Sequence, residues 1–280
     1  MYTYEELTDD VKFLTRKGVK CGSVGKSALG REIYYIRIDG TAKKGAVITA
    51  GIHAREDVST LFVVKQIYAI LKSGSPCDLW FVPMVNPDGN VLALMGAEGF
   101  SNREYLLGLN GGSEDFRLWK ANARGVDLND NFDAKWGEGA KNVRTPASEN
   151  YIGERPFSEP ETAALAAFTE RVNPLFTLSY HAKGREIYYD FGQTGNVMRR
   201  DKAIAEYAAS VTGYSLIHGT RGSCGGFKDW CVSKLGIPSL TLELVSDKYS
   251  HPLPNESIKE DFERGWDLPV KLYNFMHDGI

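Results

Sequence analysis

The sequence predicts an α/β fold, a single-domain α/β/α sandwich around a mixed, mostly parallel, twisted sheet. Short runs of β-branched and aromatic residues alternate with longer segments of helical periodicity, as in layered α/β proteins. The 280 residues include 42% hydrophobic and 25% charged side chains, an ordinary globular composition. No repeat, low-complexity tract or charge block divides the chain, so we expect one domain over residues 1–280.

Five short segments bounded by Gly, Pro or Asn have the composition of buried strands. They are Arg31–Ile38, Ala46–Ala50, Leu79–Met84, Leu175–Tyr180 and Ser239–Leu244. Sheets of this class bind ligands beyond the carboxyl ends of their strands. The residues that follow each strand are therefore the first candidates for a functional site.

Two segments between the strands have helical periodicity. Val58–Leu71 is one, and Glu159–Val172 is the other. Ser158 precedes the second segment and Glu161 follows three residues later, a pattern typical of a capping box. Asn173-Pro174 ends this helix, because proline cannot continue it.

Charge and cysteine content exclude several classes of protein. The chain has 33 basic and 36 acidic residues, a net charge of −3, so it lacks the basic excess of a nucleic-acid-binding protein. No apolar run is long enough to span a bilayer. The four cysteines form no C-x-x-C pair, so neither a disulfide framework nor a cysteine–zinc site is indicated.

The first ten residues, MYTYEELTDD, have neither the basic start nor the apolar stretch of a secretory signal. We therefore expect the protein to act in the cytoplasm. Export is the alternative if a leader has been removed from the chain.

Candidate metal ligands lie at the ends of two predicted strands. Ala46–Ala50 leads into His53 and Glu56, an H-x-x-E pattern, and Leu175–Tyr180 is followed by His181. Catalytic zinc is typically held by three such nitrogen and oxygen ligands, with a fourth position left for water. Each motif alone is more often a helix start or a hydrogen-bonded histidine, but the fold would bring the two together.

A candidate general base lies in the last predicted strand. Side chains alternate along Ser239–Leu244, so Glu243 lies in an otherwise apolar strand. A carboxylate there is costly unless it is paired or functional. Glu243 is either part of a buried salt bridge or the base that takes a proton from the attacking water and returns it to the leaving amine.

The chain resembles the zinc carboxypeptidases over nearly its whole length. The motifs that carry the resemblance are SVGKSALGREI (Ser23–Ile33), GIHARE (Gly51–Glu56), VNPDG (Val85–Gly89), GVDLNDNFDAKWG (Gly125–Gly137), SYHAKG (Ser179–Gly184), GGFKDW (Gly225–Trp230) and LTLEL (Leu240–Leu244). The resemblance implies one zinc per chain, held by His53, Glu56 and His181, with Glu243 as the catalytic carboxylate. It also implies that Asp127, otherwise an ordinary turn residue, orients the first zinc histidine.

Within that family the chain looks most like the bacterial γ-D-glutamyl-meso-diaminopimelate peptidases. RPFSEPET (Arg155–Thr162), SYHAKG, GGFKDW and HPLP (His251–Pro254) carry this likeness. It implies a murein peptide as substrate. Lys228, which could also be an ordinary loop lysine, falls at the base of the specificity pocket, where it would attract an anionic group.

Three departures from the family pattern concern the substrate and its scissile carbonyl. Asn129-Asp130 stands where digestive carboxypeptidases have Asn-Arg to bind a terminal carboxylate, so we expect Asp130 to meet an ammonium group instead. The arginine that polarises the scissile carbonyl aligns with Lys120, with Arg124 as the second candidate. The family's mobile tyrosine has no match, and Arg221 falls at its position as a possible ligand of a substrate carboxylate.

Three rival functions follow from the same residues. The first is a metallocarboxypeptidase that removes C-terminal amino acids from peptides, which Asp130 disfavours. The second is a binding module without chemistry, which the intact set of ligands and base disfavours. The third makes Cys224 a nucleophile with His218 as its base, although no third orienting residue is evident.

Overall fold

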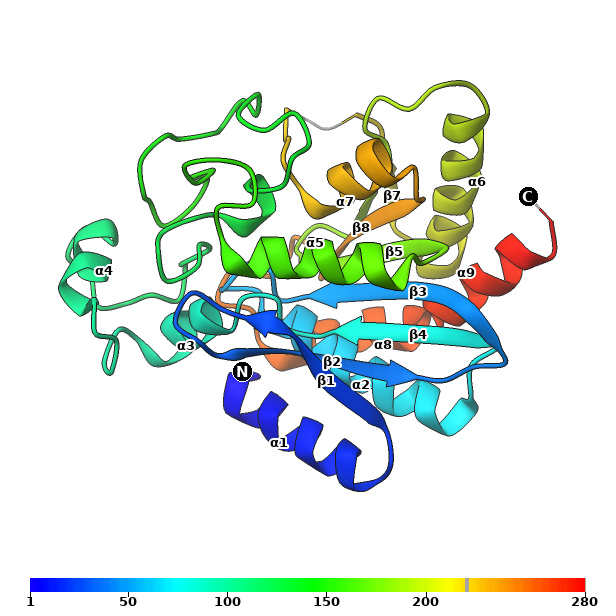
Figure 1. Cartoon of the computed structure of the whole chain (residues 1–280), viewed down its shortest axis with the longest axis horizontal. Coiled ribbons are helices and arrows are strands. Elements are labelled where there is room, and N and C mark those ends of the chain that lie inside the picture. The colour runs from blue at the N-terminus through cyan, green and yellow to red at the C-terminus, as the bar shows by residue number, and fades with distance from the viewer. Residues whose placement is uncertain (220–221, 280) are drawn as a thin grey trace.

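A twisted mixed sheet with helices on both faces forms the centre of the computed structural model, which describes residues 1–219 and 222–279 (Figure 1). The strands in chain order are β1 (Lys20–Lys26), β2 (Glu32–Ile38), β3 (Ala42–Ala50), β4 (Cys77–Val82), β5 (Phe176–Ala182), β6 (Glu186–Tyr188), β7 (Ser215–Ile217) and β8 (Ser239–Leu244). Their order across the sheet is β1-β2-β4-β3-β5-β8-β6-β7. The four central strands, β4, β3, β5 and β8, run parallel, while β1, β2 and β6 add antiparallel pairings. The predicted mixed α/β fold is confirmed.

The helices of the described residues differ widely in length. They are α1 (Tyr4–Arg16), α2 (Asp57–Ser73), α3 (Pro87–Met95), α4 (Arg103–Leu109), η1 (Leu128–Asp130), α5 (Pro160–Val172), α6 (Gly195–Thr212), α7 (Phe227–Trp230), η2 (Cys231–Leu235), η3 (Asn255–Ile258), α8 (Lys259–Gly265) and α9 (Leu268–His277). Helix α5 crosses one face of the sheet, whereas α2, α8 and α9 lie behind it in Figure 1.

Alternation along the strands builds a separate apolar core on each face of the sheet. On β3, Ile48 belongs to the core beneath α2 and α9, whereas its neighbour Val47 belongs to the core beneath α5 and α7. Both side chains are fully buried. Because the central strands are covered on both sides, they appear in the sequence as nearly continuous apolar runs.

Several details differ from the sequence-based expectations. Strand β3 begins at Ala42 and not at Ala46, and β4 spans Cys77–Val82 and not Leu79–Met84. Strand β5 continues to Ala182, so His181 lies inside the strand and not after it. Strands β1, β6 and β7 were not predicted, since β1 is rich in Gly and Lys and the other two are only three residues long. The predicted start of α5 is wrong in its detail, as the next paragraph describes.

No capping box forms at the start of α5. The helix begins at Pro160 with Glu159 as its N-cap residue. Ser158 Oγ donates a hydrogen bond to Glu159 Oε1 (2.9 Å), and Glu161 instead accepts one from the backbone N–H of Ala28 in the β1–β2 turn (2.9 Å). The Glu161 carboxylate is therefore used in a tertiary hydrogen bond with Ala28 and not in the capping box that the local sequence pattern predicted.

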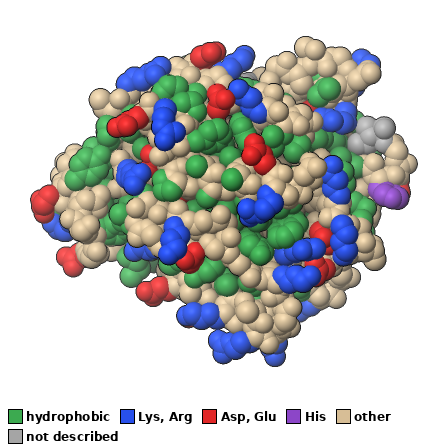
Figure 2. Space-filling view, in the orientation of Figure 1, with side chains coloured by type: hydrophobic (Ala, Val, Ile, Leu, Met, Phe, Trp, Pro, Cys, Tyr) green, Lys and Arg blue, Asp and Glu red, His purple; other side chains and the backbone are tan. Residues whose placement is uncertain are grey.

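The face of the molecule drawn in Figure 2 is not dominated by charges of one sign. Figure 2 shows acidic and basic side chains interspersed over the face that bears α5, consistent with the near-neutral net charge. Among the described residues, no helix combines the length and apolar character needed to cross a membrane.

Candidate active site

A cavity of about 480 Å³ lies at the carboxyl ends of β3, β5 and β8. His53 follows β3, His181 lies near the end of β5, and Glu243 lies near the end of β8. The volume is in the range of small-molecule binding sites. This cavity therefore lies where the strand-end rule places a ligand site.

The turn after β3 is shaped for the H-x-x-E pattern. Gly51 has φ +60°, and a Cβ there would lie 2.5 Å from Thr60 Oγ1, so the chain can turn sharply only at glycine. Asn86 of the VNPDG motif fixes this turn, because its amide nitrogen donates to the carbonyls of Ile52 (3.2 Å) and Ala121 (3.1 Å). His53 and Glu56 are thereby held just before α2.

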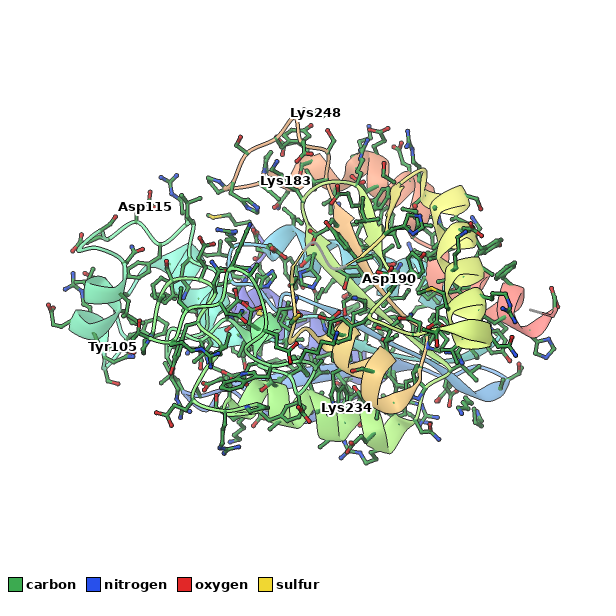
Figure 3. All side chains as sticks on the ribbon, turned by 90° about the horizontal axis from the view of Figure 1, so that it is seen from above. Tyr105, Asp115, Lys183, Asp190, Lys234 and Lys248 are labelled. Carbon is green, nitrogen blue, oxygen red and sulfur yellow. The ribbon has the colours of Figure 1, made fainter. Side chains whose placement is uncertain are left out.

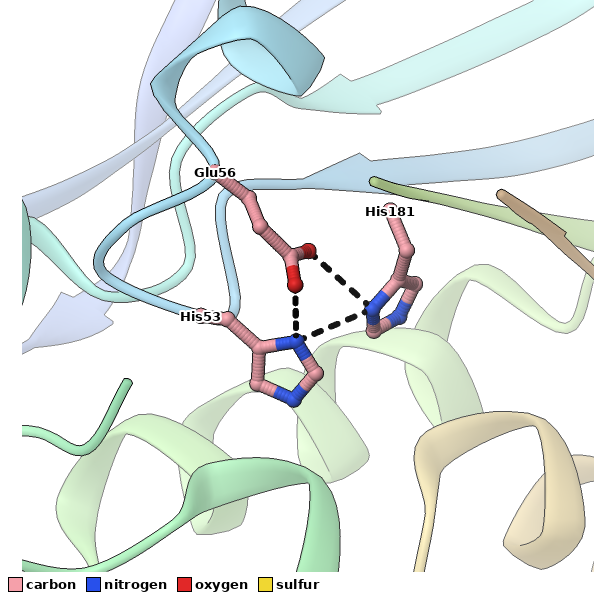
Figure 4. A group of neighbouring side chains, drawn as sticks. All are labelled: His53, Glu56 and His181. Atoms are coloured by element: carbon pink, nitrogen blue, oxygen red, sulfur yellow. Dashed lines mark hydrogen bonds and ion pairs between the residues drawn. The ribbon is translucent and has the colours of Figure 1, made fainter. Parts of the chain in front are cut away.

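Three buried ligand atoms converge at this turn, as Figure 4 shows. His53 Nδ1 lies 2.8 Å from Glu56 Oε1 and 3.2 Å from His181 Nδ1. His181 Nδ1 lies 3.4 Å from Glu56 Oε2. Two imidazole nitrogens therefore face each other beside one carboxylate.

The donor set fits a zinc ion. All three ligand atoms lie within 4.8 Å of one another. Ligands about 2.1 Å from a tetrahedral ion lie about 3.3 Å apart, close to the separations from His181 Nδ1 to the other two residues. His53, Glu56 and His181 can therefore hold a metal ion, and their nitrogen and oxygen donors suit zinc.

Glu243 lies beside this group because β8 pairs with β5 in parallel register. His181 and Glu243 are direct partners across the two strands, so their side chains lie on the same face of the sheet. Burial raises the pKa of Glu243 to about 7, and the negative charge of Glu56 adds to the effect of burial. A carboxyl with that pKa can exchange a proton near neutral pH.

Asp127 joins the metal-ligand turn to the opposite wall of the cavity. Its Oδ2 pairs with Lys120 Nζ at 2.8 Å, and its Oδ1 lies 3.4 Å from His53 Nε2. Burial would raise the pKa of the Asp127 carboxyl, but Lys120 and His53 hold it well below its usual range. The side chain is completely buried, so this carboxylate is a fixed negative charge behind His53.

The two candidates for the polarising cation occupy different places. Lys120 lines the cavity together with His53 and Glu243. Arg124 lies in a separate polar cavity, where its guanidinium is 3.7 Å from Glu159 Oε2 and half-exposed. Arg221, the candidate for a substrate carboxylate, lies outside the described residues.

The remaining predicted substrate residues line the cavity opposite the metal ligands. Asn129 Oδ1 accepts a hydrogen bond from Phe227 N–H (3.2 Å), which ties η1 to the start of α7. Lys228 is buried, and its ammonium already pairs with Asp229 (2.5 Å) and donates to the carbonyl of Asp190 (2.8 Å), a residue labelled in Figure 3. The charge of Lys228 is therefore largely balanced, which weakens it as an anion receptor.

Asp130 is nine-tenths buried on the same wall of the cavity. Burial raises the pKa of its carboxyl to about 8, and the nearby Asp127 carboxylate adds to the effect of burial.

The structure argues against the cysteine nucleophile. Burial raises the pKa of the Cys224 thiol, which disfavours the reactive thiolate. His218 Nδ1 pairs with the hydroxyl of Tyr189 at 2.8 Å. Neither group is prepared for nucleophilic catalysis.

Sequence reasoning missed several residues that line the cavity. They are Arg55, Lys141, Asn142, Glu149, Asn150, Tyr188 and Thr241. Thr241 and Tyr188 were the most accessible to prediction, because Thr241 shares a strand face with Glu243 and pairs with Tyr188 across β6 and β8. Arg55 lies within the GIHARE motif but has no ligand role there, and the others lie in irregular segments without a sequence pattern.

The family model described as zinc carboxypeptidase matches residues 4–268. γ-D-Glutamyl-L-diamino acid endopeptidase 1 of Lysinibacillus sphaericus is 35% identical over 274 residues, which cover 90% of this chain and 67% of that protein. Bovine thrombin-activatable fibrinolysis inhibitor superposes with a TM-score of 0.80 at 23% identity, covering 100% of this chain and 98% of that one. Murein-tripeptide amidase MpaA from Escherichia coli O157 superposes with a TM-score of 0.57 at 22% identity, covering 90% of each chain.

Proposed function

The chain belongs to the zinc carboxypeptidase family, and from that membership we propose that it hydrolyses the γ-D-glutamyl–diamino acid bond of murein peptides. Its class as a zinc metallopeptidase follows from the family. The proposed bond follows from the name of the L. sphaericus relative, together with the aspartate found where the family's carboxylate-binding arginine would be. The observation that carries the proposal is one cavity that unites His53, His181 and Glu243 with Asp130.

His53, Glu56 and His181 would hold one zinc ion per chain. The chemistry that zinc supplies when bound is Lewis acidity, which makes water more acidic and a carbonyl more electrophilic. Asp127 assists by fixing the ring of His53 from behind, because its Oδ1 faces the imidazole nitrogen that points away from the ligand cluster.

Glu243 would act as the general base of the reaction. It accepts a proton from the attacking water and passes it to the nitrogen of the breaking peptide bond, which leaves as an amine. Its raised pKa suits both steps near neutral pH. The in-register pairing with His181 supports this role, since it holds base and ligand on adjacent strands.

Lys120 would stabilise the developing oxyanion. One of its three N–H donors is used by Asp127, which leaves two that can face the substrate. Asn129, Asp130 and Lys228 would contact the leaving amino acid on the opposite wall. Arg124 lies too far from the cavity to be preferred for the oxyanion.

The test is hydrolysis of L-Ala-γ-D-Glu-meso-diaminopimelate by the zinc-loaded protein, beside Glu243→Gln and a chelated sample. We expect release of free diaminopimelate by the untreated enzyme alone. A peptide that ends in a free L-amino acid is the comparison substrate. Preferential cleavage of that peptide would instead support the metallocarboxypeptidase alternative.

A further inference from the structure

Among the described residues, Asp130 and the proposed general base Glu243 are the acidic side chains of the cavity that have no cationic partner within 4.0 Å. Glu149 lies 3.5 Å from Arg55, and Asp229 pairs with Lys228 at 2.5 Å. Within residues 1–219 and 222–279, no cation lies within 4.0 Å of the Asp130 carboxyl. A nine-tenths buried carboxyl in a cavity wall without a countercharge is energetically costly when ionised.

The position of Asp130 is fixed from two sides. Gly225 packs against its backbone so closely that a Cβ at position 225 would lie 2.7 Å from the Asp130 carbonyl oxygen. Asp130 N–H donates to the carbonyl of Asp127 at 3.0 Å. These contacts fix the backbone of Asp130, and the Asn142 side chain favours its ionised carboxyl at the wall of the cavity.

The charges of the described groups that face Asp130 do not balance the negative charge of its ionised carboxylate. Asp127 and Asp229 are negative neighbours, and Lys120 is the positive neighbour, already paired with Asp127. Cys224 is a further titratable neighbour, and Asn142 is the neutral side chain that hydrogen-bonds the carboxyl. Counting the Lys228–Asp229 pair as neutral, the charged neighbours of an ionised Asp130 within the described part of the chain are one positive charge short.

We propose that Asp130 determines specificity by receiving the side-chain ammonium group of the leaving diamino acid. This inference rests on the proposed function for the identity of the substrate. An ammonium group would supply the missing charge, and its donors match a carboxylate acceptor. A neutral side chain of the same length would leave Asp130 buried and unpaired.

Ammonium binding would displace a proton from Asp130. With its pKa raised to about 8, the carboxyl of the empty cavity is mainly protonated at pH 7. An ammonium group binds the ionised form, so its affinity should rise between pH 6 and pH 8 and a proton should be released to the buffer. A norleucine side chain should show neither effect.

The test compares L-Ala-γ-D-Glu-L-Lys with L-Ala-γ-D-Glu-L-norleucine as substrates of the zinc-loaded protein. We expect the wild type to prefer lysine by about 10- to 100-fold in kcat/KM, the range for a hydrogen bond to a charged group. Asp130→Asn should bring the ratio close to one, mainly through the lysine substrate. Asp133→Asn is the matched control, since this half-exposed carboxylate pairs with Lys234 outside the cavity. It should keep the wild-type preference.

An unchanged preference in Asp130→Asn, or no preference in the wild type, would overturn the inference. If neither peptide is cleaved, calorimetric binding of free L-lysine and L-norleucine to the zinc-loaded protein decides instead. Selective lysine binding with proton release, lost in Asp130→Asn, would uphold Asp130 as the ammonium site although the proposed reaction has failed. Equal binding of both amino acids to both proteins would refute it.

Discussion

The cavity has two walls that are built in different ways. The strand-end wall, comprising His53, Glu56, His181 and Glu243, is held by paired strands and by the turn after β3. The loop wall, comprising Lys120, Asn129, Asp130 and Asn142, is held mainly by side chains that bond to nearby backbone, as Asp127 does with the N–H groups of Asn129 and Asn150. The difference indicates that the sheet positions the reacting groups, whereas exchangeable loops set the choice of substrate.

Replacement of the base on the strand-end wall should have the largest effect. Glu243→Gln keeps the shape of the side chain but cannot accept the proton, so kcat should fall by about 10³-fold or more. Zinc content, measured by elemental analysis, should stay at one per chain because Glu243 is not among the converging ligands. A variant with full zinc and more than a tenth of the wild-type activity would show that Glu243 is not the general base.

Lys120 tests whether the loop wall also contributes to the reaction. Lys120→Met should lower kcat by about 10²- to 10³-fold, because it removes the cation nearest to the developing oxyanion. Arg124→Met is the matched control, and its activity should stay within about twofold, since Arg124 lies in another cavity. The reverse result would make Arg124 the polarising residue.

Replacement of Asp127 tests the contact between the two walls, because this residue lies between His53 and Lys120. Asp127→Asn should weaken zinc binding or activity by about 10- to 100-fold, the usual cost of losing the residue that orients a metal ligand. Competition with a chromogenic chelator measures the affinity for zinc, and Asp133→Asn serves again as the control. An affinity equal to that of the wild type would mean that the turn alone positions His53.

The smallest effect on activity is expected away from both walls, at Glu161. Burial raises the pKa of this carboxyl to about 7, as for Glu243, but Glu161 does not line the cavity. Its folded pKa exceeds its unfolded value near 4.5, so protonation stabilises the fold at low pH, and this contribution is lost as pH rises through 7.

Glu161→Gln removes this titration. In urea unfolding it should be about 3 kcal/mol more stable than the wild type at pH 8.5, with a difference near zero at pH 4.5. Activity should stay within about twofold. A pH-independent difference would contradict the buried, ionised state, and a large loss of activity would show that a raised pKa matters even outside the cavity.

How far each wall could be predicted from sequence follows from its construction. The strands that carry His181 and Glu243 are apolar runs with clear ends, and parallel strands bring their carboxyl ends to one edge. Ser239–Leu244 was predicted with its observed limits. The end of β5 was missed by two residues because His181 is polar, although it is buried within the strand.

The loop wall could be predicted only in part. Asn129 and Asp130 were identified because the GVDLN motif places them beside Asp127. Asn142 and Lys141 were missed, since residues 131–150 contain no periodic pattern and reach the cavity only through tertiary contacts. The balanced charge of Lys228 was missed as well, because adjacency in sequence does not show that its ammonium group pairs with Asp229, and the carbonyl of Asp190 that it also contacts is distant in sequence.

The register between β5 and β8 has a consequence for laboratory evolution. Backbone pairing sets the spacing of neighbouring strands at about 4.8 Å, whatever the side chains of distant loops. Gene libraries that randomise residues 137–150 should therefore change which substrates are cleaved, while the catalytic reaction stays the same. Recombination between relatives should yield active proteins when the crossover falls in that segment. A crossover inside β5 or β8 should yield inactive proteins, because a one-residue shift of register there would turn His181 or Glu243 to the opposite face of the sheet.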